Sequence, residues 1–413
     1  MRKVIKILVK VISVIILLSI FLPVLSTLVL NLRGVQNIAI KRASEFASEY
    51  LGTKVSIDRI DIDLFSRVRV DGFYVEDHEQ DTLLYVGRAT ARFSSLNIPK
   101  DGLLIRSAEA EDAIFILREL QSGELNIRPI VQKLQKNNGK KSNFSMVIED
   151  IDATGLEFRY ERLQHRNPEY GVDYYNMQIK DISAQLKDFT VDRGRVYADV
   201  ESLSAVERSG FVIDNLATDF FVYEGELRFD NIIIETPTSN ISVPELLIKG
   251  DSWDEYKEYI DKVQMSGYVE DSYLSTQDLG YFAPGVRGWN TTVSNVNASF
   301  EGVVRNLSGV INTATIENHT TVKGKFHITG LPDWRVSKYV VGIERLHTTS
   351  SDVENLLSNI LPNPLPQSAN KIVKNMKWAD ARLTFGGRLD AFRAVGNIVT
   401  GAGDLSADIS LNR

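Results

Sequence analysis

The chain contains no cysteine among its 413 residues. Disulfide bonds, thiol chemistry and metal sites built from thiolates are therefore excluded. Proline is scarce as well, with 11 residues, whereas hydrophobic residues make up 43% of the chain. A chain of this length and composition can fold around a substantial apolar interior, so its stability has to come from packing and not from covalent cross-links.

An excess of positive charge is also lacking, because the formal net charge is −7. This balance argues against nucleic acid, or another polyanionic surface, as the main partner. The HExxH, GxSxG, P-loop and GxGxxG motifs are absent, and the five histidines do not show the spacing of metal ligands. The acidic stretch 76–81 lacks the EF-hand pattern and is expected to be a solvated turn. We therefore expect no enzyme, no cofactor and no metal.

One long apolar run is present, from Val11 to Leu32, without a charged residue. As a helix it would extend roughly 33 Å, close to the thickness of a bilayer's hydrocarbon core. Four basic residues and no acidic ones precede it: Arg2, Lys3, Lys6 and Lys10. By the positive-inside rule this predicts a cytoplasmic tail at residues 1–10, a single-pass anchor at 11–32, and the remaining chain on the far side of the membrane.

A cleaved signal peptide is the alternative interpretation of this run. Pro23 could end a short apolar region, and Val24-Leu25-Ser26 resembles a cleavage site. The apolar run nevertheless continues to Leu30, which exceeds the usual length of the apolar region of a signal peptide, about 7–15 residues. This length favours the uncleaved anchor.

Beyond the anchor, an amphipathic helix is expected over residues 33–52, with Gly52 placed to end it. The apolar residues then alternate with polar ones at a period of two, as in 55–64, 68–75, 156–160, 227–229, 326–328 and 383–385. Such alternation is typical of strands with one apolar and one solvated face. The fold class predicted from it is mainly β, with a few short helices.

Local sequence signals predict three such helices, near residues 126–135, 252–263 and 351–361. The last two begin with a capping box, in which a serine is followed three residues later by glutamate. A polar stretch at 137–142 is expected to link a first β segment, residues 53–136, to a second, residues 143–413. The helices are expected to plug or cap the β structure.

The final segment alternates cleanly almost to the last residue. Its outward strand edge would be unpaired unless a further strand followed or a partner strand were added. The candidate residues for strand addition are Leu405, Ala407, Ile409 and Leu411.

Several sequence stretches together resemble a known family. They are VQNIAIKRASEFASEYLGTKVSIDRIDIDLFSRVRVDGFYVED, DTLLYVGRATARF, SYLSTQDLGYFAP, VNASFEGVVRNLSG, KGKFHITGLPDW and LTFGGRLDAFRAVGNIVTGAGDLSADISL. The chain resembles AsmA-like proteins, specifically the TamB (translocation and assembly module) type of Bacteroidetes. The motifs are loose and none is catalytic, and relatives run longer and end in a domain that this sequence does not include.

The resemblance implies a long curled antiparallel sheet that forms an open hydrophobic groove, anchored in the inner membrane with its bulk in the periplasm. It also implies phospholipid as a ligand, lipid transport toward the outer membrane, and a role in outer-membrane biogenesis and protein secretion with an outer-membrane assembly protein as partner. Alternating apolar residues are the candidates for the groove lining: Ile57, Ile62, Val70, Phe158, Phe229, Phe326 and Phe385.

Alternatives remain at this point. The same alternation would suit an ordinary β-sandwich with a closed core. An envelope scaffold that binds β-rich partners by strand addition, without any lipid conduit, is the second functional hypothesis. A hydrolase or glycan-binding module is the third, and a polar cleft with converging carboxylates would be its signature.

Overall fold

The computed structural model describes residues 33–62, 67–93, 102–137, 145–162, 170–283, 286–331, 333, 335–360 and 366–412. The expected anchor at 11–32, the basic tail before it and most of the expected linker lie outside these ranges. Within them, no helix combines the length and the apolarity needed to cross a membrane. The chain divides into two compact units, with the boundary between Glu224 and Gly225.

The predicted fold class is confirmed in its coarse form, because strands dominate both units and helices are few. The elements of the first unit are α2 (Arg33–Leu51), β1 (Val55–Ser56), β2 (Arg59–Ile62), β3 (Arg67–Glu76), β4 (Thr82–Phe93), β5 (Gly102–Glu119), α3 (Arg128–Asn137), β6 (Ser145–Arg162), β7 (Asn176–Asp192), β8 (Arg195–Glu207), β9 (Val212–Ile213) and β10 (Asn215–Tyr223).

These strands form a sheet in chain order. β1 and β2 pair side by side with one edge of β3, and β9 and β10 pair with β8 at the other end. All described pairings are antiparallel except that of β5 with β6, which is parallel along nearly the full length of both strands. The segment between them, expected to be a domain linker, is therefore a crossover connection inside one unit.

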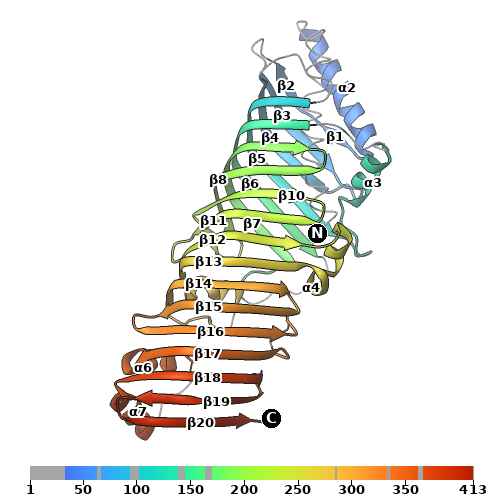
Figure 1. Ribbon diagram of the computed structural model, residues 1–413. Helices are drawn as coiled ribbons and strands as arrows, with labels where there is room; N and C mark the ends of the chain where they lie inside the picture. Colours follow the sequence, from blue (N-terminus) through green and yellow to red (C-terminus); the bar gives the residue numbers. More distant parts are fainter. Residues whose placement is uncertain are drawn as a thin grey trace. The chain divides into compact units, whose positions relative to one another are not determined.

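A closed core occupies the early part of the first unit. Ala43, Ala47 and Leu51 of α2 are buried against the sheet, together with Ile130 of α3. Both helices lie beside β1 to β3 on the same side (Figure 1). The small and apolar residues of α2 recur at helical spacing, so one stripe of the helix faces the core while Lys41 and Arg42 remain exposed. This half of the unit is a conventional two-layer structure.

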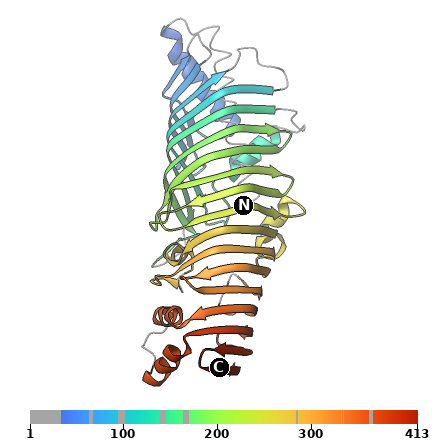
Figure 2. The same cartoon turned by 60° about the vertical axis from the view of Figure 1, so that its left-hand side comes forward.

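The second unit is a regular antiparallel meander in which each strand pairs with the next (Figure 2). Its elements are β11 (Glu226–Glu235), β12 (Asn240–Lys249), η1 (Trp253–Glu258), α4 (Tyr259–Lys262), β13 (Gln264–Ser275), α5 (Thr276–Phe282), β14 (Thr292–Val303), β15 (Asn306–Ile316), β16 (Thr320–Thr329), β17 (Lys338–Thr349), α6 (Ser350–Ile360), α7 (Gln367–Met376), β18 (Trp378–Arg388), β19 (Ala391–Thr400) and β20 (Gly403–Leu411).

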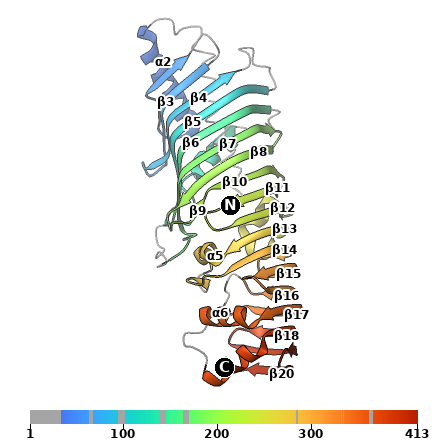
Figure 3. The same ribbon diagram turned by 90° about the vertical axis from the view of Figure 1, so that its left-hand side faces the viewer.

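The helices of this unit lie at the ends of its strands. α5, α6 and α7 lie at one end, and the η1–α4 segment lies at the other (Figures 1 and 3). The expected helices near 252–263 and 351–361 correspond to η1–α4 and α6. Thr349 directly precedes α6, and its hydroxyl accepts a hydrogen bond from the N–H of Asp352, so the cap lies two residues before the predicted Ser351.

Two parts of the second unit repeat the same contacts. In each, a helix that follows a strand uses an aspartate of its first turn to hold the preceding hairpin turn. Asp278 of α5 accepts hydrogen bonds of 2.6 Å from the hydroxyls of Thr236, Thr238 and Ser239. Asp352 of α6 accepts bonds from Thr320 Oγ1 at 2.9 Å and from the His319 N–H at 3.0 Å.

In both parts, the first residue of the helix also donates the same kind of backbone hydrogen bond. The N–H of Thr276 donates to the Thr291 carbonyl, and the N–H of Ser350 donates to the Lys377 carbonyl, both at 3.0 Å. The second unit therefore contains two similar hairpin–strand–helix segments, although the sequence shows no repeat of fixed period.

We expect Asp352→Ala to lower the free energy of unfolding by about 1.5–3 kcal/mol, because buried donors would lose a charged acceptor. Burial opposes ionisation of Asp352, but the bonds from Thr320 and His319 outweigh it and lower its pKa below the ordinary 3.8. Its contribution should thus be present above that value and be lost as the pH falls through the lower, folded-state pKa. Urea titrations at several pH values measure this. The exposed Asp404→Ala serves as the control, and equal losses in both variants would contradict the assignment.

Candidate functional site

The strand register of the second unit separates its side chains onto two faces. Residues directly opposite each other in an antiparallel ladder lie on the same face. From β11 to β20 one unbroken series of opposed residues, which we call the apolar row, is Phe229, Leu246, Gly267, Phe300, Gly309, Phe326, Val341, Phe385, Ala394 and Ile409. Every member is apolar or glycine, and four are phenylalanines.

A second series two residues along each strand has the same character. It runs Leu227, Ile248, Met265, Gly302, Leu307, Ile328, Tyr339, Gly387, Phe392 and Leu411. We call the surface that these two series share the apolar face. The series between them projects from the opposite, polar face and runs Arg228, Leu247, Ser266, Glu301, Ser308, His327, Val340, Gly386, Arg393 and Ser410. The second unit is thus a two-faced sheet.

Glycines shape the middle of the apolar row. A Cβ atom added to Gly309 would lie 2.2 Å from Cζ of Phe326, and one added to Gly267 would lie 2.7 Å from Cζ of Phe300. Each phenylalanine ring therefore lies across the glycine of the neighbouring strand instead of standing upright. The rings form a low, smooth apolar floor, which only the absence of a side chain at the glycines permits.

Aromatic residues of η1 and α4 close one end of this face. The rings of Trp253 and Tyr256 are 5.2 Å apart, both residues are buried, and the hydroxyl of Tyr259 contacts the sulfur of Met265 on the apolar face. The Tyr256 hydroxyl donates to the carbonyl oxygens of Gly225 and Ile248. Burial raises the pKa of Tyr256 to about 12, so this hydroxyl remains a protonated donor at neutral pH.

At the opposite strand ends, near α6 and α7, the small residues Ala379 and Ala381 of the apolar face are buried. Between the two ends the side chains of the apolar row are half-buried, apart from the exposed Ile409 on β20. In the part of the second unit that the structure describes, no second sheet packs on this face. The sheet therefore differs from a β-sandwich, in which an equivalent face would be covered by another sheet about 10 Å away.

The structure places the predicted groove residues in different surroundings. Phe229, Phe326 and Phe385 all belong to the apolar row, on three different strands. Phe158, on β6 of the first unit, is half-buried and packs against the core with its ring 6.1 Å from that of Phe115. The remaining predicted residues, Ile57, Val70 and Ile62, do not belong to the apolar row.

Ile57 and Val70 are 6% and 4% exposed within the closed core under α2. Because helices cover that part of the sheet, these two residues do not line an open surface and are left out of the site. The side chain of Ile62 lies outside the described residues.

The predicted strand-addition residues lie on β20, which pairs with β19 along one edge. Along its other edge β20 pairs with no strand that the structure describes. Leu405, Ile409 and Leu411 are 57%, 58% and 41% exposed, and by register they continue the apolar face, as does the half-buried Ala407. The two sets of candidate residues in the second unit thus belong to one surface.

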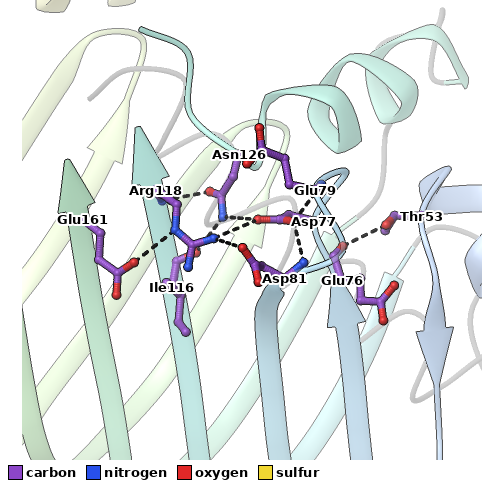
Figure 4. Close-up of polar contacts among 9 residues, drawn as sticks. All are labelled: Thr53, Glu76, Asp77, Glu79, Asp81, Ile116, Arg118, Asn126 and Glu161. Atoms are coloured by element: carbon purple, nitrogen blue, oxygen red, sulfur yellow. Dashed lines mark hydrogen bonds and ion pairs between the residues drawn. The ribbon is translucent and has the colours of Figure 1, made fainter. Parts of the chain in front are cut away.

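The acidic stretch 76–81 forms the turn between β3 and β4. Figure 4 shows Asp77 at its centre, where its carboxylate accepts the N–H groups of Glu79 and Asp81 at 2.9 Å and the side-chain amide of Asn126 at 3.1 Å. Arg118 joins the turn to β6 through Glu161. The described residues contain no cluster of three or more metal-ligating side chains. These carboxylates fix a hairpin.

A shallow groove of about 440 Å³ lies over β12 to β16. Most of its lining residues project from the polar face, among them Ser266, Ser299, Ser308 and Tyr268. Its other lining residues, Gly267, Phe300, Gly309 and Phe326, belong to the apolar row. The polar groups that line this groove are four hydroxyls, two carboxylates and one lysine.

Searches against family models, curated proteins and solved structures found no match to this chain.

Sequence reasoning overlooked several members of the site. Phe300 and Val341 follow the same alternation as the predicted residues. Gly267 and Gly309 gave no signal, because a glycine under a ring is visible only when the strands are paired. The aromatic residues Trp253, Tyr256 and Tyr259 lie within the helix expected near 252–263, but their place at the end of the apolar face depends on the fold.

We expect Gly309→Val to destabilise the protein by about 1–3 kcal/mol, since the added side chain collides with the Phe326 ring and forces it upward. The matched control is Gly342→Val on β17, where an added Cβ atom has no neighbour within 4 Å. Chemical denaturation of both variants measures the difference. A loss at Gly342 equal to that at Gly309 would show that β-propensity, and not the ring contact, is responsible.

Proposed function

We propose that this protein holds the acyl chains of phospholipids on the apolar face of β11–β20 and acts as a lipid conduit. The observation that carries the proposal is the apolar row, which crosses ten strands without a polar side chain and is not covered by a second sheet within the described residues. An apolar surface that stays half-buried over ten strands is unfavourable in water and is typical of a binding surface.

Dimensions and energies are consistent with acyl chains. Ten strands spaced by about 4.8 Å give an apolar row of roughly 43 Å, whereas the acyl region of one bilayer leaflet is about 15 Å thick. Transfer of sixteen methylene groups from water would contribute roughly 13 kcal/mol before the entropic and desolvation costs of binding. The row is therefore long enough for more than one chain and apolar enough to retain it.

The biological setting belongs to the same proposal. A resemblance to the AsmA-like, TamB-type proteins and the apolar segment 11–32 support an inner-membrane anchor, with the bulk of the chain in the periplasm. In this setting the protein would move phospholipid toward the outer membrane and support outer-membrane protein translocation and assembly.

Adjacent valines on β17 provide a matched test. Val341 belongs to the apolar row, whereas Val340 projects from the polar face and is 52% exposed. Val341→Glu places a charge on the proposed acyl site and should reduce co-purified phospholipid at least tenfold, because an ionised carboxylate is costly to bury against acyl chains. Val340→Glu should leave the bound lipid unchanged. Native mass spectrometry of the detergent-extracted protein measures both.

A wild-type protein that carries no lipid would contradict the proposal. Equal amounts of bound lipid in Val341→Glu and Val340→Glu would also contradict the proposal. Lipid that is insensitive to the face carrying the charge would not be bound on the apolar row.

A second candidate function is that of a scaffold that binds a β-rich envelope protein by strand addition. It rests on the free edge of β20 within the described residues and on the exposure of Leu405 and Ile409. An added strand would form backbone hydrogen bonds and extend both faces of the sheet.

Photo-crosslinkers test this second function. Placed at Ser406 or Ser410 of β20, they should capture an envelope protein in cells, whereas a crosslinker at the exposed Thr384 of the internal strand β18 should not. Capture at Thr384 with equal yield, or only of other copies of the same chain at Ser406, would count against strand addition.

A further inference from the structure

Helix α7 combines features that the lipid-conduit proposal does not use. It lies at the strand ends of the second unit, next to α6 (Figure 1). Its last turn carries a basic residue, Lys374. Between Glu354 and Asp380 the sequence contains three lysines, Lys371, Lys374 and Lys377, and no acidic residue. In a chain with a net charge of −7, this is a local reversal of sign.

The three lysines are exposed, and none forms an ion pair with a residue that the structure describes. The next acidic residue along the chain, Asp380, lies 2.9 Å from Nδ1 of His347. Some exposed lysines elsewhere in the unit are compensated, as Lys325 is by Glu344 at 3.1 Å and Lys262 by Glu258 at 2.7 Å. The charge of α7 is therefore available to an external anion.

Apolar residues accompany this charge. Ile372 is 67% exposed, the highest value among the large hydrophobic residues reported as exposed in the described chain, and Trp378 directly after the helix is 37% exposed. Helical geometry places Ile372 at the border between the exposed surface and the half-buried side formed by Val373 and Met376. An exposed isoleucine and tryptophan beside uncompensated lysines are the residues that occupy a membrane–water interface.

The helix is held firmly in this position. The carbonyl of Met376 accepts the Gly401 N–H at 3.0 Å, which ties the end of α7 to the turn between β19 and β20. The Lys377 carbonyl accepts the N–H of Ser350 at the start of α6. Five exposed residues of α7 and of the two positions after it, Lys371, Ile372, Lys374, Lys377 and Trp378, are here called the α7 patch. They are presented by a fixed element of the sheet edge.

We propose that the α7 patch docks the second unit onto the surface of a bilayer that contains anionic phospholipid. The lysines would contact the phosphate groups while Ile372 and Trp378 enter the boundary between head groups and acyl chains. An acidic protein would satisfy the charge but would not account for the exposed apolar pair, so the bilayer is the favoured partner. This docking is independent of the apolar face and would bring the strand ends of the second unit to a membrane.

The test uses the full chain reconstituted in neutral phosphatidylcholine nanodiscs, so that an anchor in the disc cannot insert elsewhere. Flotation then measures binding to acceptor vesicles of phosphatidylcholine alone or with phosphatidylglycerol. We expect at least tenfold stronger binding to the anionic vesicles, weakened by salt. The triple variant K371Q/K374Q/K377Q should lose this preference, and Ile372→Ser should weaken binding without removing the salt dependence.

The control K323Q/K325Q/K338Q removes the same charge from β16 and β17 and should bind like the wild type. Circular dichroism and thermal unfolding confirm that each variant is folded. Equal binding by both triple variants would overturn the proposal, because a general charge effect would then explain the attraction. If the wild type bound neither kind of vesicle, the proposal would also be overturned. An acidic protein surface would then be the remaining candidate partner. Neither result bears on lipid loading of the apolar face, which Val341→Glu tests separately.

Discussion

The antiparallel ladder of β11 to β20 is the constraint on which the rest of the second unit depends. Because side chains alternate between faces, ten strands must remain in phase for a single apolar row to form. The register keeps this phase from Phe229 on β11 to Ile409 on β20 without interruption in the apolar row. A shift of one residue in β13, β14 or β15, for example, would place Ser266, Glu301 or Ser308 on the apolar face.

The irregularities of the ladder are confined to positions where they do not disturb this phase. Register shifts occur near Asp271 on β13 and Asn295 on β14, both of which have positive φ angles. These bulges lie toward the strand ends that carry α5 and α6, where the strands bend and where Asp278 and Asp352 hold the hairpin turns. The central rows therefore stay flat enough for the phenylalanine rings to lie across Gly267 and Gly309.

The two units show how the same alternation produces different interiors. In the first unit, α2 and α3 cover the early strands, and Ile57 and Val70 become core residues. In the second unit the helices lie at the strand ends, so most of the central apolar side chains remain half-buried. Periodicity predicts that a face is apolar, but the placement of helices decides whether that face is closed. The α7 patch illustrates the same principle, because lysines that look unremarkable in the sequence become a charged surface through the absence of nearby acids.

Local sequence patterns were enough to predict the class of structure: period-two alternation predicts two-faced strands, and capping residues together with helical spacing predict the few helices. It also predicted Phe229, Phe326 and Phe385 as members of an apolar surface, because alternation is a local property of each strand. Only the tertiary structure decided that these three residues share one row, that rings rest on glycines of neighbouring strands, and that residues 137–142 lie in a crossover between the parallel strands β5 and β6. These features depend on register and on contacts between residues far apart in the chain, and no local pattern encodes which strand will lie beside which.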